Sequence, residues 1–232
     1  MVIDPRKYSD LREVPKYTIG DVAWYLDVPP STIRWWFLGR TYIVKGELRQ
    51  SRELIRPAHY DPYNPSLSFY NLVEAHILAA TRKVHNISMQ KLRDAIDYLQ
   101  QRYQSQHPLL GHDFFTDGKD LFIKKLSETV SLGKKGQLAF KEIVDIYLDR
   151  LMKDSAGWPT EIYPIRHRDT TKKPIVIVPT VASGQPVTAR NSIRVAVLIN
   201  RKDAGESAQQ IAEDYGLTTL EVEQAIQYME AA

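Results

Sequence analysis

The sequence of 232 residues contains no cysteine. This absence excludes disulfide bridges, thiolate metal sites and a cysteine nucleophile, and it fits a reducing cytoplasm. Serine–histidine–aspartate arrangements, phosphate-binding glycine loops and dinucleotide-binding glycine motifs are missing too. We therefore expect no catalytic residue, no cofactor and no enzymatic activity.

Long apolar runs and a large excess of one charge are also absent. No stretch approaches 18 uninterrupted apolar residues, and the charged N-terminal segment lacks the apolar region of a signal peptide, so we expect a cytoplasmic protein without membrane contact. Lys and Arg total 31 against 28 Asp and Glu, a net charge of only +3. Contact with nucleic acid would therefore depend on where the cations lie rather than on their number.

The sequence offers no recognisable metal site. The six histidines are scattered, and "HPLLGHD", which holds His107, His112 and Asp113, lacks a known ligand spacing. Asp113, Asp117 and Asp120 match neither a calcium loop nor a two-metal nuclease pattern. We expect no bound metal.

Two short helices are predicted near the N-terminus. Apolar residues recur at helical spacing in the first, namely Ile19, Val22, Ala23 and Leu26. "DVPP" ends this helix, because Pro29 disfavours the α conformation of Val28. Ser31 then provides an N-cap for a second helix that runs toward Gly39. Two helices across such a tight break form a helix-turn-helix.

The segment after Gly39 predicts a small β hairpin, or wing, from β-rich "TYIV" and the turn "KGE". Between positions 31 and 56 there are two acidic side chains and six basic ones: Arg34, Arg40, Lys45, Arg49, Arg52 and Arg56. A charge run alone is more often a solvated face, but beside a helix-turn-helix it favours nucleic acid. The proline-rich stretch "PAHYDPYNP" that follows is predicted to be a non-helical connector.

The middle of the chain is less clearly patterned. Longer helices are predicted over about 68–84 and 88–103, with Ser88 as a cap for the second. "FFTDGKDLFI" is typical of a hairpin around Asp117 and Gly118. "AFKEIVDIYLDRLM" fits either a helix or an aromatic-rich pair of strands.

The C-terminal part predicts a second compact unit of three helices after the apolar run "IVIV". "IRVAVLINRKDAG" is the first helix, "ESAQQIAEDYG" has a capping box from Ser207 to Gln210 and a stop at Gly216, and "LTTLEVEQAIQYM" has a capping box from Thr218 to Glu221. This is a trihelical bundle with a second helix-turn-helix. If exposed, "IVIV" could add a strand to a partner copy.

The N-terminal unit resembles the MerR family of winged-helix regulators. "YTIGDVA" at 17–23, Val28 and "TIRWW" at 32–36 match that family's first helix, turn and recognition helix in order and spacing, and the resemblance extends to about residue 103. The sequence departs from the family at Asp27, where glycine is usual, and no long dimerising helix follows. These departures bear on effector sensing more than on DNA binding.

The resemblance implies that the second helix reads DNA. Helical spacing puts Ile33 and either Trp36 or Phe37 inward. The side chains left on the groove side are Thr32, Arg34 and Trp35, where an arginine can bind phosphate or guanine and an aromatic edge can contact the backbone. Alternatively, both adjacent tryptophans anchor a small core from two sides. The candidate DNA-contacting residues are Thr18, Ser31, Thr32, Arg34, Trp35, Arg40, Lys45, Arg49 and Arg52.

The C-terminal unit resembles a small domain described as a VapB-like antitoxin domain. The segments that carry the resemblance are "GQPV" at 184–187, "IRVAVL" at 193–198 and "AGESAQQIAEDYGLTTLEVEQAIQY" at 204–228. That family usually has Gly-Thr-Arg before the isoleucine and proline after it. This chain has Arg190-Asn191-Ser192 and Arg194 there, so Arg190, Asn191 and Arg194 are candidate partner-binding residues.

We therefore expect a mostly α fold with minor β structure. A MerR-like winged helix-turn-helix occupies residues 1–103, the fold of the middle region 104–171 is left open, and residues 172–232 form the antitoxin-type trihelical domain. The two resemblances together imply an antitoxin of a type II toxin–antitoxin system that binds operator DNA as a homodimer, represses its own operon and neutralises a PIN-like ribonuclease toxin. The alternatives are a toxin-free MerR-like transcriptional regulator, with a small-molecule pocket in the Tyr- and Phe-rich middle region, and an unrecognised enzyme.

Overall fold

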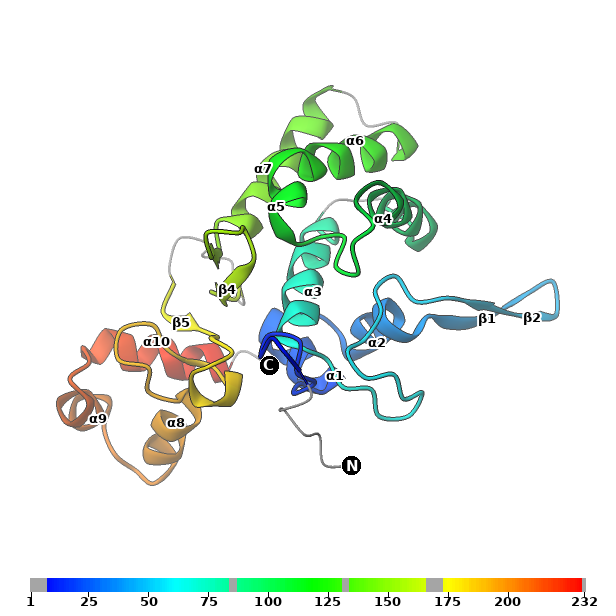
Figure 1. The fold of residues 1–232 in the computed structure, drawn as a ribbon. Coiled ribbons are helices and arrows are strands. Elements are labelled where there is room, and N and C mark those ends of the chain that lie inside the picture. The colour runs from blue at the N-terminus through cyan, green and yellow to red at the C-terminus, as the bar shows by residue number, and fades with distance from the viewer. Residues whose placement is uncertain (1–7, 84–86, 131–133, 166–172, 231–232) are drawn as a thin grey trace.

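The computed structural model describes residues 8–83, 87–130, 134–165 and 173–230. Helices dominate these segments, and the strands within them form three separate two-stranded sheets (Figure 1). The predicted fold class, mostly α with minor β structure, is confirmed. Nowhere in the described segments is a helix both long and apolar enough to cross a bilayer.

Helices α1 (Ile19–Leu26) and α2 (Pro30–Leu38) form the predicted helix-turn-helix. Thr18 caps α1 in a capping box: its hydroxyl accepts the N–H of Asp21 at 3.1 Å, and the Asp21 carboxylate accepts the N–H of Thr18 at 2.8 Å. The prediction that Ser31 caps α2 is wrong. Pro29 holds the cap position and Pro30 is the first helical residue, where a proline needs no hydrogen-bond acceptor and already has a helical φ.

The predicted wing is an antiparallel hairpin of β1 (Arg40–Val44) and β2 (Glu47–Ser51). Its turn residues Lys45 and Gly46 both have positive φ, 52° and 82°, as tight two-residue hairpin turns require. Figure 1 shows the hairpin extending well away from the helices. Both of its faces are therefore open, apart from the end that joins α2.

Helix α3 (Phe69–Thr81) is the centre of the molecule, because all of its residues are buried. Ser68 caps it and Ser88 caps α4 (Met89–Tyr103), as predicted for the latter. After α4 the chain forms α5 (Gly111–Asp113), a π-helical turn η2 (Phe114–Gly118), α6 (Lys119–Val130) and α7 (Lys134–Leu148). Of the two structures considered for "AFKEIVDIYLDRLM", the helix is observed as far as Leu148, and the last two residues start a short strand.

The predicted hairpin around Asp117 and Gly118 is wrong, because this stretch is helical. Phe114 and Phe122 are fully buried and stand about two turns apart on one helical face. Gly118 is buried between them, where an added Cβ would meet the Asp113 carbonyl oxygen at 3.0 Å and the Tyr103 ring at 3.2 Å. The glycine serves close helix packing here and not a turn.

The C-terminal part begins after the hairpin of β3 (Leu151–Lys153) and β4 (Pro159–Ile162). It consists of β5 (Ile175–Val176) paired with β6 (Val187–Thr188), the short 3-10 turn η3 (Ala182–Gly184), and helices α8 (Val195–Asp203), α9 (Ala208–Tyr215) and α10 (Thr219–Glu230). Both predicted capping boxes and the stop at Gly216 are confirmed. Three helices with local start and stop signals thus form as the sequence indicates.

The apolar run at 175–178 is not the exposed edge that was considered. Ile175, Val176 and Ile177 are buried. The first two pair with β6, and the backbone of Ile177 exchanges hydrogen bonds of 2.9 and 3.1 Å with that of Ile162 in β4. The run is therefore buried and paired within the chain, and it does not form the exposed apolar edge that a partner strand would need.

The buried apolar residues form two clusters. The first runs from Tyr17 to Ile177 and includes Phe122 and Phe140, so helices α6 and α7 share a core with the winged helix. The second lies within 175–228, and Trp24 of α1 packs against both. The Trp24 ring meets that of Tyr228 edge to face at 5.4 Å, and the Tyr228 hydroxyl donates to the Tyr25 carbonyl at 3.3 Å. The C-terminal helices are therefore docked directly on α1.

Stability should depend on pH through His76, which is fully buried in α3 and hydrogen-bonds through Nε2 to the Tyr147 carbonyl at 2.9 Å. Burial lowers the pKa of His76 from 6.5 to about 4. Between these values the unfolded chain binds a proton that the folded chain does not, so the stabilisation present above pH 6.5 is lost as the pH falls toward 4. We expect the free energy of unfolding to fall by about 2 kcal/mol through this residue from about pH 7.5 to about pH 5.

Urea unfolding of the native protein and of His76→Gln at both pH values measures this contribution. Glutamine retains an N–H donor for the Tyr147 carbonyl but does not titrate, so the variant should show the smaller pH effect. An equal pH effect in the two proteins would contradict the assignment.

Candidate nucleic-acid interface

Helix α2 buries one apolar stripe and exposes the opposite side. Ile33, Trp36 and Phe37 are at most 1% exposed, whereas Arg34 is exposed and Trp35 is half-buried. Trp35 belongs to neither apolar cluster of the described residues. Of the two adjacent tryptophans, Trp36 is the core residue and Trp35 faces outward. The alternative in which both tryptophans anchor the core is therefore wrong.

The exposed face of Trp35 carries a cation from the wing. The guanidinium carbon of Arg40 lies 4.5 Å from the centroid of the Trp35 ring, a cation–π distance. Arg40 is the first residue of β1 and remains exposed. This contact links the wing to the outer face of α2 and leaves the positive charge accessible.

The structure corrects the expectation that Thr32 faces a DNA groove. Its side chain is only 7% exposed. The hydroxyl accepts a hydrogen bond of 2.8 Å from the guanidinium of Arg82, just after α3. Thr32 thus joins α2 to α3. By contrast, Ser31 is exposed, and Thr18 is exposed at the start of α1 with its hydroxyl 2.7 Å from the Asp21 carboxylate.

The candidate cations of the wing differ in whether they already form an ion pair or a hydrogen bond within the protein. Lys45 is exposed at the hairpin turn and has no ion-pair or hydrogen-bond partner among the described residues. Arg49 lies 3.7 Å from the exposed carboxylate of Glu47. Arg52 forms an ion pair and hydrogen bond with Asp97 of α4. Arg40, Lys45 and Arg49 are therefore available to a ligand, and Arg52 is held within the protein.

The strand register gives the wing two unlike faces. Tyr42 pairs with Arg49, so these two and Arg40, two residues along β1, share one face. Ile43 pairs with Leu48 on the other face, where the two side chains are 72% and 75% exposed. The face that joins Trp35 thus carries two arginines and a tyrosine, and the opposite face carries two exposed apolar side chains.

Sequence reasoning missed one partner of α2. Arg34 is exposed, and its guanidinium donates a hydrogen bond to the carbonyl of Pro62, in the connector between the wing and α3. The same connector holds Tyr60 and Tyr63, which are 53% and 90% exposed. Two tyrosines in a proline-rich stretch were a visible signal, but nothing local indicated that the stretch returns to α2.

The C-terminal candidates have internal contacts as well. Asn191 donates from its side-chain amide to the carbonyls of Tyr215, at 2.8 Å, and Gly216, at 3.1 Å, and so caps the end of α9. Arg190 lies 3.3 Å from the Glu221 carboxylate. Arg194 is exposed at the start of α8 and lines a surface hollow. It has no side-chain partner within the described chain, so it is the freest of the three.

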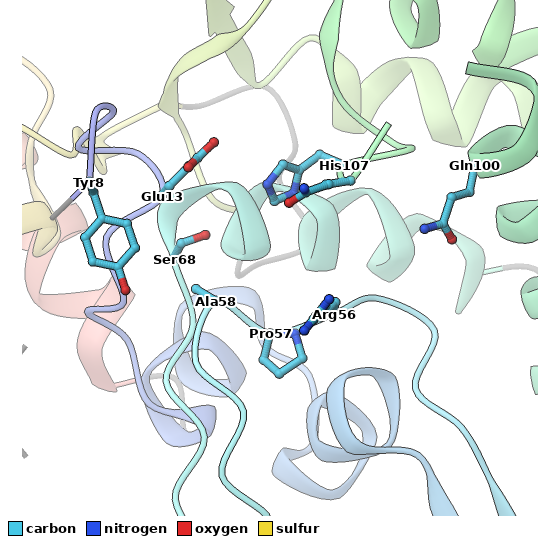
Figure 2. A pocket seen from close by; sticks show the side chains of 9 residues that line it. Tyr8, Glu13, Arg56, Pro57, Ala58, Ser68, Gln100 and His107 are labelled. Carbon is cyan, nitrogen blue, oxygen red and sulfur yellow. The ribbon is translucent and has the colours of Figure 1, made fainter. Parts of the chain in front are cut away.

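A polar cavity of about 460 Å³ lies between the connector, the start of α3 and the end of α4 (Figure 2). His107 in its wall lies 3.2 Å from Glu74, a fully buried carboxylate of α3. Burial acts to lower the pKa of His107, but the negative charge of Glu74 outweighs this effect, so the pKa is raised. The cavity is lined by Tyr8, Glu13, Arg56, Pro57, Ala58, Ser68, Gln100, Gln106 and His107. This lining differs from the Tyr- and Phe-rich pocket in the middle region that the alternative of a ligand-responsive regulator implies.

Among the described residues, no group of three or more His, Asp or Glu side chains is placed to hold a metal ion. Cysteine ligands are excluded by the sequence. The candidate interface in the described part of the chain therefore consists of cations and aromatic rings, without a metal-binding cluster.

Two family models match separate parts of the chain. Residues 15–96 match a family described as "Putative DNA-binding HTH domain", which spans α1, α2, the wing, α3 and half of α4. Residues 175–229 match "Protein of unknown function (DUF433)", which spans β5 to α10. The chain thus combines a winged helix-turn-helix, similar to a family described as putatively DNA-binding, with a second domain similar to DUF433.

Similarity extends over nearly the whole chain. The chain is 28% identical to "Putative antitoxin VapB45" of Mycobacterium tuberculosis over 92% of its length and 93% of that protein, and 23% identical to the uncharacterised protein Rv2308 of the same organism over 94% and 90%. The crystal structure of Rv2018 from that organism superposes with a TM-score of 0.68 at 25% identity and covers 92% of this chain and 98% of that one. The resemblance to antitoxins that the sequence indicated is confirmed.

The contacts of Asn191 predict a structural role in place of partner binding. Asn191→Ala removes two hydrogen bonds to the end of α9 and should lower the free energy of unfolding by about 1–2 kcal/mol. Arg194→Ala, a matched change at an exposed side chain without a partner in the described chain, should stay within about 0.5 kcal/mol of the native protein. Chemical denaturation of the three proteins compares them, and equal losses in both variants would refute the distinction.

Proposed function

We propose that this protein is the antitoxin of a type II toxin–antitoxin pair. In this proposal it is a non-enzymatic cytoplasmic repressor that binds the operator of its own operon as a homodimer through a MerR-like winged helix. The observation that carries the DNA-binding part is a cationic and aromatic edge at which Arg40 of the wing lies over Trp35 of α2. Arg34 is exposed on the same helix, and Arg49 is exposed on the wing face that carries Arg40. Guanidinium groups at such an edge suit phosphate oxygens and guanine.

A dimer follows from the size of this edge. One short recognition helix and one wing cover only a few base pairs, whereas a two-fold dimer reads two half-sites about one DNA turn apart. The net charge of +3 gives little non-specific attraction, so affinity depends on the local cations and on both half-sites being bound together.

The toxin-binding part is supported by similarity over 92% of the chain to a protein named as an antitoxin. We infer that the partner is a PIN-like ribonuclease and that the C-terminal unit contacts it near Arg194. Arg194 lies in the domain at 175–229 and not in the helix-turn-helix. The same chain could therefore bind DNA and toxin at once.

One observation favours a second candidate, a toxin-free regulator that responds to a small ligand. The cavity beside His107 is polar, and Arg56 in its wall has no side-chain partner among the described residues. A small organic anion would suit it. The two candidates differ in their partners, since only the first requires a toxin encoded next to this protein.

Cations that form no ion pair within the protein should contribute more to the affinity for DNA than a cation that is already paired. Arg40→Gln should weaken binding to a duplex covering the region upstream of its own gene by about 1–3 kcal/mol if it reads a base. If Arg40 instead contacts a phosphate, the substitution should reduce the slope of log K against log salt by about one. Arg52→Gln, the matched control, should change both quantities less, because Asp97 already holds Arg52. Fluorescence anisotropy across a salt series compares them, and equal effects would contradict the ranking.

Co-expression with the neighbouring reading frame tests the toxin assignment. A PIN-like product should co-elute with the protein and lose its toxicity to growth. Arg194→Glu should weaken co-elution and leave DNA binding unchanged, because Arg194 lies in the C-terminal domain. Absence of a co-eluting ribonuclease, with DNA binding intact, would favour the ligand-responsive regulator.

A further inference from the structure

The connector between the wing and α3 is an ordered loop that lies against the recognition helix. We call residues 57–66 the tyrosine loop. Its base is closed by two backbone hydrogen bonds between His59 and Ser66, of 2.9 and 3.1 Å. Its middle is held to α2, because the Arg34 guanidinium donates to the Pro62 carbonyl. A segment that the sequence presents as a plain connector is thus positioned by the helix that faces DNA.

The tip of the loop is shaped by Asp61. Its carboxylate accepts the backbone N–H of Tyr63 at 2.8 Å and that of Asn64 at 3.2 Å, and these bonds lower its pKa. The Asp61 carboxylate is therefore hydrogen-bonded to backbone N–H groups of the loop itself. Tyr63 is left 90% exposed, the largest exposed fraction among the large apolar and aromatic side chains that the structure describes, and Tyr60 is 53% exposed.

These two rings contribute little to the fold at such exposure, although the loop that carries them is fixed by hydrogen bonds at its base, middle and tip. A preorganised loop loses little conformational freedom when a ligand binds. Tyrosine suits a nucleic-acid backbone, because its hydroxyl can donate to a phosphate oxygen and its ring can contact a sugar. Arg34, Arg40 and Arg56 are exposed cations on α2, at the wing base and at the loop entrance, which favours a polyanion over an apolar protein surface.

We propose that the tyrosine loop is a second DNA-contacting element, in which Tyr63 and Tyr60 lie against the duplex backbone beside the recognition helix and Arg34 acts as the positioning residue of the loop. This proposal rests on the proposed function, because it extends the DNA-binding surface of the same winged helix. It adds two aromatic residues outside the helix-turn-helix and the wing. It also assigns to Arg34 a role besides direct contact with a base or a phosphate.

Salt dependence separates a tyrosine contact from a cation contact. The full-length protein and its variants are titrated into a duplex from upstream of its own gene and into a random duplex of equal length, across a range of salt concentrations. Tyr63→Ala should weaken binding about tenfold, the loss of roughly one hydrogen bond to a charged group. The slope against log salt should not change, because a neutral side chain releases no counterion.

Three further variants complete the test. Tyr63→Phe keeps the ring and should recover part of the affinity if sugar contacts contribute. Leu138→Ala, a matched loss of a side chain 62% exposed on α7, should bind as the native protein does. In the double variant of Arg34→Ala and Tyr63→Ala the loss should be smaller than the sum of the single losses, because Arg34 acts partly through the loop.

The outcomes are distinct. Native affinity in Tyr63→Ala and Tyr60→Ala, with the native protein binding the duplex, would overturn the tyrosine loop alone. A variant that binds DNA normally but no longer co-elutes with a toxin would also overturn it, since the loop would then be a protein interface. If the native protein binds neither duplex at low salt, the proposed function fails and this proposal fails with it.

Discussion

The burial of one stripe of α2 fixes the direction of the whole candidate interface. Ile33, Trp36 and Phe37 fill the core from positions i, i+3 and i+4. A rotation by one residue would move Arg34 about 100° toward that core, and an unpaired buried charge costs several kcal/mol. The Trp36 carbonyl also accepts the N–H groups of Leu54 and Ile55, at 2.8 and 3.1 Å. The chain leaving the wing is thereby anchored to the same helix.

Because the wing and the tyrosine loop both return to α2, the cations near it do not act alike. Arg52 is bound by Asp97, Arg34 holds a backbone carbonyl, and Arg40 lies over an indole ring. Lys45 at the hairpin turn and Arg56 at the end of this segment have no side-chain partner in the described chain. A count of positive charges between 31 and 56 therefore overstates the charge that DNA could neutralise. What distinguishes these residues is the internal contact each already makes, and only the fold supplies that information.

The parts of the fold that could be predicted from the sequence are those that depend on neighbouring residues. The capping boxes at Thr218 and Ser207, the cap at Ser88 and the outward position of Arg34 all follow from spacings of three or four residues. The Ser31 cap fails for a local reason, because Pro30 starts the helix one residue earlier. Two other wrong predictions share a different cause. Asp117 and Gly118 look like a hairpin turn, yet Phe114 and Phe122 pack on one helical face. Thr32 looks exposed until Arg82, fifty positions away, binds it. Tertiary contacts decide these cases, and a pattern of nearby residues does not contain them.

The docking of the C-terminal helices on α1 gives the two ends of the protein a physical connection. Trp24 is packed by both apolar clusters, and Tyr228 of α10 covers it edge to face while bonding to the Tyr25 carbonyl. Figure 1 shows the wing and the C-terminal helices on opposite sides of α1, so ligands at the two ends need not collide. Separation of the C-terminal unit would expose Trp24 on the first helix of the helix-turn-helix, at a cost set by the aromatic area uncovered. A partner that tightens or loosens this contact would therefore act on the helix-turn-helix through α1.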